Sequence, residues 1–339
     1  MMRVRSTWLI GVLSACGAGA SDVPLDGGNA DAAPPEPPAA LTRWLTGDPA
    51  DAVATTQRGL LLMGGGTDVD AAFAWQRDRI GGGDVVVLRA SGADGYNDYL
   101  FSDIGGVNSV ETLLVDTAAL AREPYVAWVL DHAEAVFLAG GDQAVYVAAW
   151  GDGPVATALT AAYARGAVLG GTSAGCAVLG ELLFAATNGS VTSAEALADP
   201  YNPYMTIERD FVEVAPLASV ITDSHFAARD RMGRLLAFTA RAMVDGTAAR
   251  PIGLGIDERT ALLVDESGTG TVVGSGSVYA VMPQQPPAQC AAGATLTWVD
   301  VPVHELQAGD TIALPAGVTT VPARTISAGR GSLTPADPY

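Results

Sequence analysis

Short apolar runs alternate with helical stretches in the central part of this chain, and this alternation constrains the fold more than any other feature. The apolar runs, each of strand length, are residues 60–63, 84–89, 111–115, 135–139 and 167–170. The helix-like segments are residues 69–80, 123–132, 143–150 and 155–165, and a further helix is expected over residues 174–185. Near-continuous apolar strands alternating with helices indicate an α/β fold, in which helices cover both faces of a mostly parallel sheet.

Glycine turns follow three of the predicted strands, at residues 64–66, 140–141 and 170–171. Functional sites in parallel α/β sheets lie beyond the carboxyl ends of the strands. The three turns therefore predict that the functional site lies at one edge of the sheet.

The third turn leads into Gly171-Thr-Ser-Ala-Gly175, a G-x-S-x-G pattern. In a nucleophile elbow, a tight strand-to-helix turn lifts the serine hydroxyl above the sheet, and small neighbours let the two backbones approach. An ordinary glycine-rich turn is the alternative, because the chain contains 40 glycines. The other two glycine turns favour the elbow, and Ser173 is our candidate nucleophile.

A serine nucleophile needs a base, and the chain contains only three histidines. His132 falls at the end of a predicted helix, and His304 lies in the tail of the chain. His225 directly follows a predicted strand at residues 218–222. We expect His225 to be the base; a packed core histidine is the alternative.

The acid that orients the base is expected between Ser173 and His225, which is the order of α/β hydrolases. Among the carboxylates there we favour Glu195, because it lies in a polar loop that is free to fold over the site. An oxyanion hole also needs two backbone N–H groups. We expect them from Ala174, next to the nucleophile, and from Gly65 in the first glycine turn.

Three arginines follow the candidate base, at Arg229, Arg231 and Arg234. Arginines beside an active site hold carboxylates through two parallel hydrogen bonds. The alternative is a solvated helix start with ion pairs to Asp223 or Asp230. Cys176, one turn after the serine, is expected to pack rather than react.

Composition limits the classes of partner. The 339 residues can bury one large core, and 49% hydrophobic content with a mean hydropathy of +0.27 indicates a globular chain. A net charge of −19 argues against nucleic acid and anionic membrane surfaces as partners. We expect no metal and no cofactor, and the sequence leaves a homodimer open.

The N-terminal residues are typical of a targeting segment. Arg3 and Arg5 precede a short apolar stretch, and small residues lead to Cys16. This pattern resembles a bacterial lipoprotein signal, in which Cys16 becomes lipidated. The alternative is a secretory signal cleaved after Ala18 or Ala20. Either way, we expect an extracellular or cell-envelope protein that contacts a membrane only through a lipid anchor.

The chain divides into four parts at the level of sequence. Residues 1–16 are the predicted signal, and residues 17–40 are a Pro/Ala/Gly tether that cannot pack. Residues 41–282 form the predicted hydrolase domain. Residues 283–339 are expected to be a β-rich extension packed on that domain, as an edge hairpin or a small appendage.

Four linked motifs resemble the cyanophycinases, a serine peptidase family that also contains aspartyl dipeptidases. They are Gly140-Gly-Asp-Gln143, Gly171-Thr-Ser-Ala-Gly175, Asp223-Ser-His-Phe226 with its three arginines, and Gly255-Ile-Asp-Glu258. The resemblance runs from about residue 60 to residue 282. It implies a fold similar to class I glutamine amidotransferases.

The resemblance also implies a substrate, cyanophycin, which is a polyaspartate chain with arginine on each side-chain carboxyl. The family cleaves its backbone to β-Asp-Arg dipeptides with a serine, a histidine and an acid. Ser173 and His225 match the first two directly, and Gln143 matches a glutamine near the nucleophile. The three arginines match positions that hold substrate carboxylates. The acid matches least well, and the signal fits the extracellular branch of the family.

Three functions remain open on the sequence. The first is a secreted cyanophycinase. The second is an aspartyl or isoaspartyl peptidase of the same fold that acts on short peptides. The third is a catalytically silent surface binding protein on this scaffold.

Overall fold

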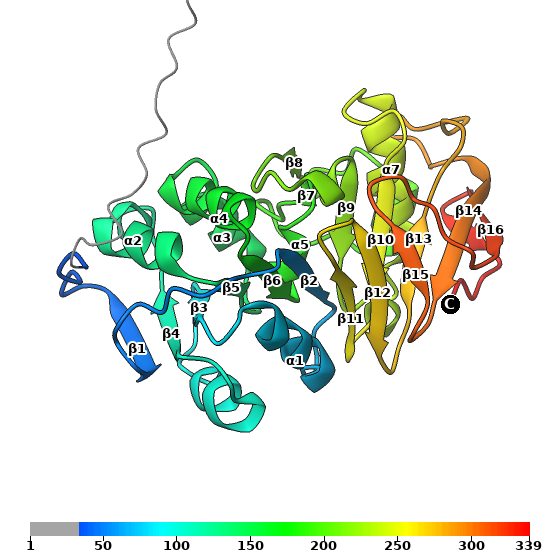
Figure 1. The fold of residues 1–339 in the computed structure, drawn as a ribbon. Helices are drawn as coiled ribbons and strands as arrows, with labels where there is room; N and C mark the ends of the chain where they lie inside the picture. The colour runs from blue at the N-terminus through cyan, green and yellow to red at the C-terminus, as the bar shows by residue number, and fades with distance from the viewer. Residues whose placement is uncertain (1–33) are drawn as a thin grey trace, which may run out of the picture. The chain divides into compact units, whose positions relative to one another are not determined.

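The first of two β-sheets carries the parallel core of the fold in the computed structural model, which describes residues 34–339 (Figure 1). The predicted signal and most of the predicted tether lie outside the described residues. In spatial order, the strands of this sheet are β1 (Thr42–Gly47), β4 (Ser109–Leu114), β3 (Asp84–Arg89), β5 (Ala135–Leu138), β6 (Val168–Thr172), β2 (Gly59–Met63), β11 (Thr260–Val264), β12 (Thr269–Gly274) and β15 (Thr311–Ala313). The five strands from β4 to β2 are parallel to one another. The strands at the two edges, β1 on one side and β11, β12 and β15 on the other, each run antiparallel to their neighbours.

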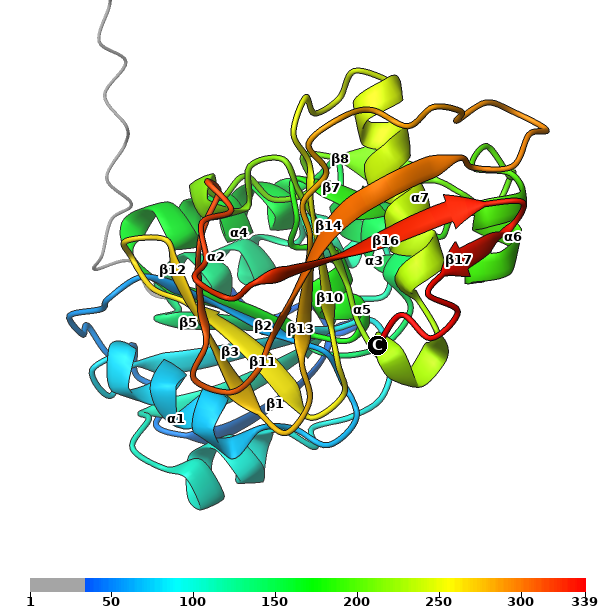
Figure 2. The same cartoon turned by 90° about the vertical axis from the view of Figure 1, so that its right-hand side faces the viewer.

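The second sheet is mostly antiparallel. Its strands, in spatial order, are β17 (Ser332–Thr334), β16 (Ala323–Gly329), β14 (Trp298–Leu306), β13 (Val278–Val281), β10 (Ile252–Ile256), β9 (Val220–Asp223), β7 (Leu182–Phe184) and β8 (Ile207–Arg209). Only the neighbours β10, β9 and β7 are parallel. Figure 2 shows the long strands β14 and β16 side by side in this sheet.

The α-helices are α1 (Asp70–Arg79), α2 (Pro124–His132), α3 (Gln143–Trp150), α4 (Pro154–Arg165), α5 (Ala174–Ala177), α6 (Ser193–Ala198) and α7 (Met232–Val244). Short 3₁₀ turns lie at η2 (Leu120–Arg122), η3 (Ala215–Leu217) and η4 (Ala227–Arg229), and a π-helical turn lies at η1 (Tyr99–Ile104). Both α2 and α4 begin with proline, whose fixed φ suits a first helical position. Within residues 34–339, no helix combines the length and the apolar character that a membrane crossing requires.

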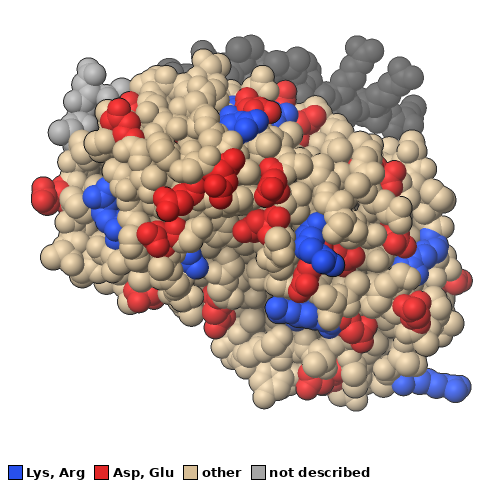
Figure 3. Space-filling view, turned by 90° about the horizontal axis from the view of Figure 1, so that it is seen from below, with Lys and Arg blue, Asp and Glu red and all other residues tan. Residues whose placement is uncertain are grey.

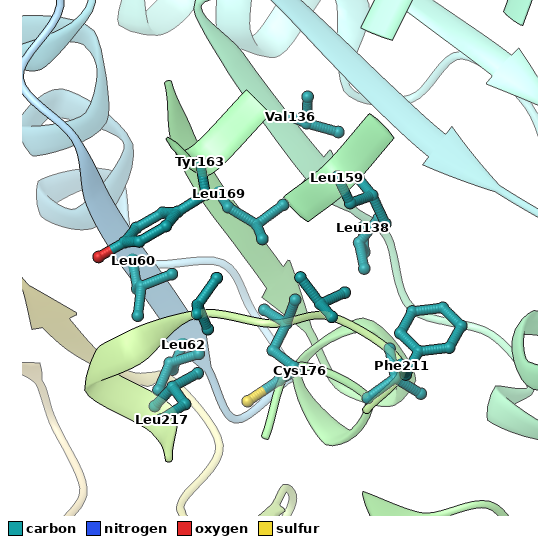
Figure 4. Close-up of a cluster of buried hydrophobic side chains, with 14 of the residues drawn as sticks. Leu60, Leu62, Val136, Leu138, Leu159, Tyr163, Leu169, Cys176, Phe211 and Leu217 are labelled. Atoms are coloured by element: carbon teal, nitrogen blue, oxygen red, sulfur yellow. The ribbon is translucent and has the colours of Figure 1, made fainter. Parts of the chain in front are cut away.

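Side chains that alternate along the strands of the first sheet pack into two hydrophobic clusters, one on each face of the sheet. Leu60 and Leu62 of β2 point into the cluster that includes α2, α3 and α4, whereas Leu61 and Met63 point into the one under α1. Figure 4 shows the first cluster, in which Cys176 of α5 packs among leucines from β2, β5 and β6. A third cluster buries one face of the second sheet against α7. The parallel strands are thus buried on both faces, which explains their unbroken apolar sequence.

The α/β class, the core of neighbouring parallel strands and the β-rich C-terminal strands are confirmed, but the first sheet as a whole is mixed, with four parallel and four antiparallel neighbour pairs. Two local expectations are wrong. The helix predicted over 174–185 ends at Ala177, because Gly180 packs against the backbone of Val220 and the chain then enters β7. The tail is not a single hairpin or appendage: β15 extends the first sheet, and β14, β16 and β17 extend the second.

Candidate active site

Ser173 occupies the tight turn between β6 and α5 and adopts a strained backbone conformation, with φ 54° and ψ −117°. The glycines around it are required by close backbone contacts. A β-carbon on Gly171 would lie 2.5 Å from the carbonyl carbon of Gly175, and one on Gly175 would lie 2.0 Å from the carbonyl oxygen of Leu138. The backbone N–H of Ser173 donates to the carbonyl of Met63, at the end of β2. The G-x-S-x-G pattern therefore forms an elbow rather than an ordinary turn.

His225 follows β9, the strand predicted to precede it, and its ring Nε2 lies 2.8 Å from Ser173 Oγ. The histidine is buried and has a left-handed backbone, with φ 47°. Its N–H donates to the carbonyl of Gly64 at 2.7 Å, which ties it to the first glycine turn. Two turns that are distant in the sequence thus hold the serine and the histidine in hydrogen-bonding contact.

The other ring nitrogen of His225, Nδ1, lies 2.7 Å from Oε1 of Glu258. Glu258 sits in the turn between β10 and β11. A carboxylate that accepts the Nδ1 proton leaves the lone pair of Nε2 directed at the serine hydroxyl. Ser173, His225 and Glu258 therefore form one continuous chain of two short hydrogen bonds.

The prediction that Glu195 orients the histidine is wrong. Glu195 lies in α6, and its carboxylate accepts from the N–H and hydroxyl of Thr192 in a capping box. This bond satisfies an orphan N–H at the helix start, so the side chain serves α6 rather than His225. Gly255-Ile-Asp-Glu258, one of the four linked motifs, contains the signal for Glu258, since it lies where β10 ends. The assumption that the acid precedes the histidine in the chain excluded it.

The electrostatics of the pair suit a base and its orienting anion. Burial lowers the pKa of His225 below its ordinary value, and the positive charges of Arg229 and Arg231 lower it further. The hydrogen bond to Glu258 raises the pKa but does not outweigh these effects. The hydrogen bond from His225 lowers the pKa of Glu258. At neutral pH the imidazole is therefore neutral and the carboxylate ionised, as general-base catalysis requires.

Two of the three predicted carboxylate-binding arginines are engaged with the protein itself. Arg234 is 3% exposed and holds both oxygens of Asp223 through Nε at 2.7 Å and Nη2 at 2.6 Å. Arg231 donates to Asp223 and to the carbonyl of Ser224. Asp223 is fully buried; although its desolvation opposes ionisation, Arg234 and Arg231 hold its pKa below the usual range. The prediction that Arg234 binds substrate is wrong, because its buried guanidinium is paired with Asp223 at the end of β9.

The third arginine, Arg229, differs from the other two. Its side chain is exposed, and it makes no ion pair with another residue of the 34–339 range. Its charge is near enough to lower the pKa values of His225 and Glu258. Arg229 is thus the arginine of the three whose guanidinium is exposed and close to His225.

The other predicted contributors surround the elbow. Ala174 begins α5 directly after the serine, and Gly140 lies against Ser173, since a β-carbon there would be 3.4 Å from Ser173 Cβ. Gly65 lies against the imidazole of His225. Gln143 begins α3, and its amide nitrogen donates to the carbonyl of Phe184 at 2.9 Å, so part of its hydrogen-bonding capacity is used by β7.

The remaining histidines and the elbow cysteine take no part in this cluster. His132 stacks on Trp128 and bonds to its carbonyl, and His304 bonds to the carbonyl of Val321. Cys176 is fully buried, and burial raises the pKa of its thiol. It packs, as expected, because a buried neutral thiol is a poor nucleophile.

Acidic side chains outnumber basic ones in this chain. Figure 3 shows more red than blue across the face that it presents, in keeping with 37 acidic and 18 basic residues in the chain. Such a surface attracts cationic ligands and repels polyanions.

Comparisons with known proteins agree with this geometry. The model of peptidase family S51 matches residues 100–272, about half of the chain. A cyanophycinase of Synechococcus elongatus is 33% identical over 192 residues, which cover 56% of this chain and 53% of that protein. A cyanophycinase of Trichormus variabilis is 32% identical over 183 residues, covering 53% and 55%. The chain spans about half the length of the curated relatives it matches.

Among solved structures, a peptidase from an acI-B1 Actinobacterium superposes with a TM-score of 0.51 at 17% identity, covering 77% of this chain and 98% of that one. At this level of identity the likeness concerns the fold. The family match includes the Ser173 elbow and both partners of the serine, His225 and Glu258. The chain belongs to peptidase family S51.

Proposed function

We propose that this chain is a serine peptidase in which Ser173 is the nucleophile, His225 the base and Glu258 the orienting acid. The observation that carries the proposal is the chain of hydrogen bonds from Ser173 Oγ to His225 at 2.8 Å and from His225 to Glu258 at 2.7 Å. The elbow conformation of the serine supports it, because such strained residues cluster at functional sites.

The reaction follows from these contacts. His225 Nε2 takes the proton of the Ser173 hydroxyl as Oγ attacks the scissile carbonyl, and the carbonyl electrons move onto the oxygen. The N–H groups of Ala174 and Gly65 are proposed to bind that oxyanion. Collapse of the intermediate breaks the C–N bond, and the imidazolium returns its proton to the leaving amine. Water then attacks the acyl-enzyme with His225 again as base, which releases the acid product and restores Ser173.

We further propose that the substrate is cyanophycin and the product β-Asp-Arg. The relatives named cyanophycinase support this substrate. Exposed Arg229 beside the serine suits a chain rich in carboxyl groups. An acidic surface also suits arginine-bearing substrates, since it raises their local concentration. The N-terminal sequence, with Arg3 and Arg5 before a short apolar stretch and Cys16, supports a proposed location in the cell envelope or the extracellular space.

The test is digestion of insoluble cyanophycin by the full chain, with the products identified by mass spectrometry. Release of β-Asp-Arg by the wild type, and its loss in Ser173→Ala, supports the proposal. An intact polymer together with hydrolysis of short isoaspartyl peptides would assign the chain to small peptides instead. No hydrolysis of either, with unchanged polymer binding in Ser173→Ala, would make it a binding protein.

A further inference from the structure

Helix α7 begins seven residues after His225, and its first N–H is satisfied from a distant segment. Arg231 at the N-cap makes no side-chain cap bond. The N–H of Met232 donates instead to the phenol oxygen of Tyr339 at 2.9 Å. The first N–H groups of a helix have no partner within the helix. Tyr339 therefore caps α7 across 107 positions of the sequence.

The same phenol also fixes the turn before α7. Its hydroxyl donates to Oδ1 of Asp230 at 3.1 Å. Asp230 has a left-handed backbone with φ 48°, a conformation that a residue with a side chain adopts only when its surroundings favour it. From the other side, the Ser193 hydroxyl donates to the carbonyl oxygen of Asp230. Tyr339 is thus one of two distant side chains that hold this turn.

The ring of Tyr339 packs against Phe226, the residue that follows the histidine. It meets Phe226 edge-on, with centroids 5.9 Å apart, and Tyr279 of β13 at 5.7 Å. Phe226 directly follows His225 and is fully buried. Gly255 of β10 leaves space for it, since a β-carbon there would lie 2.5 Å from the ring. Edge-to-face aromatic pairs contribute interaction energy beyond that of burial alone, so Tyr339 helps to hold the ring of Phe226 in place.

Backbone hydrogen bonds connect the residues of the turn between these anchors. The N–H of Arg229 donates to the carbonyl of His225, and that of Arg231 to the carbonyl of Phe226. A shift at Asp230 or Met232 would therefore be passed to the histidine and to both arginines.

We propose that Tyr339 is a positioning residue, which fixes the segment from His225 to Met232 so that the imidazole stays in reach of Ser173 with Arg229 and Arg231 beside it. The inference rests on the proposed function, in which His225 is the base. It assigns a role to Tyr339, which contacts the segment after His225 rather than Ser173.

The experiment compares three variants of the full chain. Tyr339→Phe keeps the ring and removes the hydroxyl; Tyr339→Ala removes both. The matched control is Tyr201→Phe, which deletes a similar phenol–carboxylate bond of 2.6 Å to Asp245, at the other end of α7. Since small displacements of reacting groups cost up to about 100-fold in rate, we expect kcat to fall about tenfold in Tyr339→Phe and about 100-fold in Tyr339→Ala. Tyr201→Phe should keep the wild-type kcat.

A second readout separates positioning from general destabilisation and does not need a substrate. The charged groups facing the imidazole are Glu258, Arg229 and Arg231, and burial lowers its pKa further. Loosening the segment admits water and lets the arginines move away, so the pKa of His225 should rise in both Tyr339 variants. NMR titration can follow it, because the chain has only three histidines.

The outcomes are distinct. A raised His225 pKa in Tyr339→Phe, with wild-type titration in Tyr201→Phe, supports the inference even if the wild type hydrolyses no peptide and the proposed function fails. An unchanged titration in Tyr339→Phe overturns the inference, even if cyanophycin hydrolysis is established. If Tyr339→Ala does not fold, Tyr339→Phe alone decides.

Discussion

The imidazole of His225 lies directly against the α-carbon of Gly65. A β-carbon at this position would fall 2.5 Å from both Cε1 and Nε2, well inside van der Waals contact. Gly65 also has φ +98°, which side chains disfavour. The first glycine turn thus forms the wall behind the proposed base.

Gly65→Ala should therefore displace the imidazole from Ser173 and lower kcat by about 100-fold. Gly246→Ala is the matched control, because Gly246 has φ +74° with no atom within 4 Å of its would-be β-carbon. Both substitutions should cost about 1–3 kcal/mol of unfolding free energy from backbone strain. Equal kcat values in the two variants, measured alongside urea unfolding, would show that Gly65 has no special relation to the base.

Glu258→Gln should lower kcat by about 10³- to 10⁴-fold, because an amide at this position no longer stabilises the imidazolium or selects its tautomer. Glu195→Gln should leave kcat unchanged, since glutamine also completes a capping box. Steady-state kinetics of the two isosteric variants distinguish the acids. Loss of activity in Glu195→Gln with full activity in Glu258→Gln would reverse the assignment.

Arg234→Met should destabilise the fold by about 3–5 kcal/mol, because it leaves the buried carboxylate of Asp223 without this partner. Arg229→Met should change the unfolding free energy by about 0.5 kcal/mol or less but raise KM, because Arg229 is exposed and free of ion pairs within residues 34–339. The pKa of Asp223 is held low, so its contribution is present above about pH 4 and is lost as the pH falls below that value. Chemical unfolding at pH 7 and steady-state kinetics provide the two measurements. Similar stability in both variants would contradict the buried-pair account.

The acid limb of kcat/KM should lie below about pH 6.5, because burial and two arginines lower the pKa of His225 and only the neutral ring accepts the serine proton. Arg229→Gln removes one of the charges that oppose protonation, so the limb should move to higher pH. The shift should shrink at high salt, since Arg229 is exposed. Arg250→Gln, at another exposed arginine, should not move the limb. A limb that stays in place in Arg229→Gln would mean that Arg229 does not act on the base.

Much of the framework could be predicted from local sequence. The parallel strands are buried on both faces and therefore read as apolar runs, and the glycines around Ser173 are forced by contacts along the same turn. His225 could be found because histidines are rare and this one follows a strand. These signals lie within a few residues of the feature they predict.

The parts that sequence reasoning missed depend on contacts between distant segments. Glu258 becomes the partner of His225 only because β9 and β10 are parallel neighbours, so their ends meet at one edge. For Arg234 the sequence leaves both a ligand-binding role and an ion pair with Asp223 open, and only the buried contact between the two side chains decides for the ion pair. The sequence predicts a β-rich extension over residues 283–339 but not which sheet each strand joins: β15 pairs with β12 of the first sheet and β14 with β13 of the second. Pairing of this kind has no local pattern.

The claim that Ser173 is a nucleophile activated by His225 can be tested most directly by covalent labelling with a fluorophosphonate, followed by intact-mass measurement and peptide mapping. We predict one adduct, on Ser173, that forms in the wild type and in Glu195→Gln and is lost in Ser173→Ala and His225→Ala. An unlabelled Ser173 in the folded wild-type protein, or labelling that persists at the same rate in His225→Ala, would contradict the account.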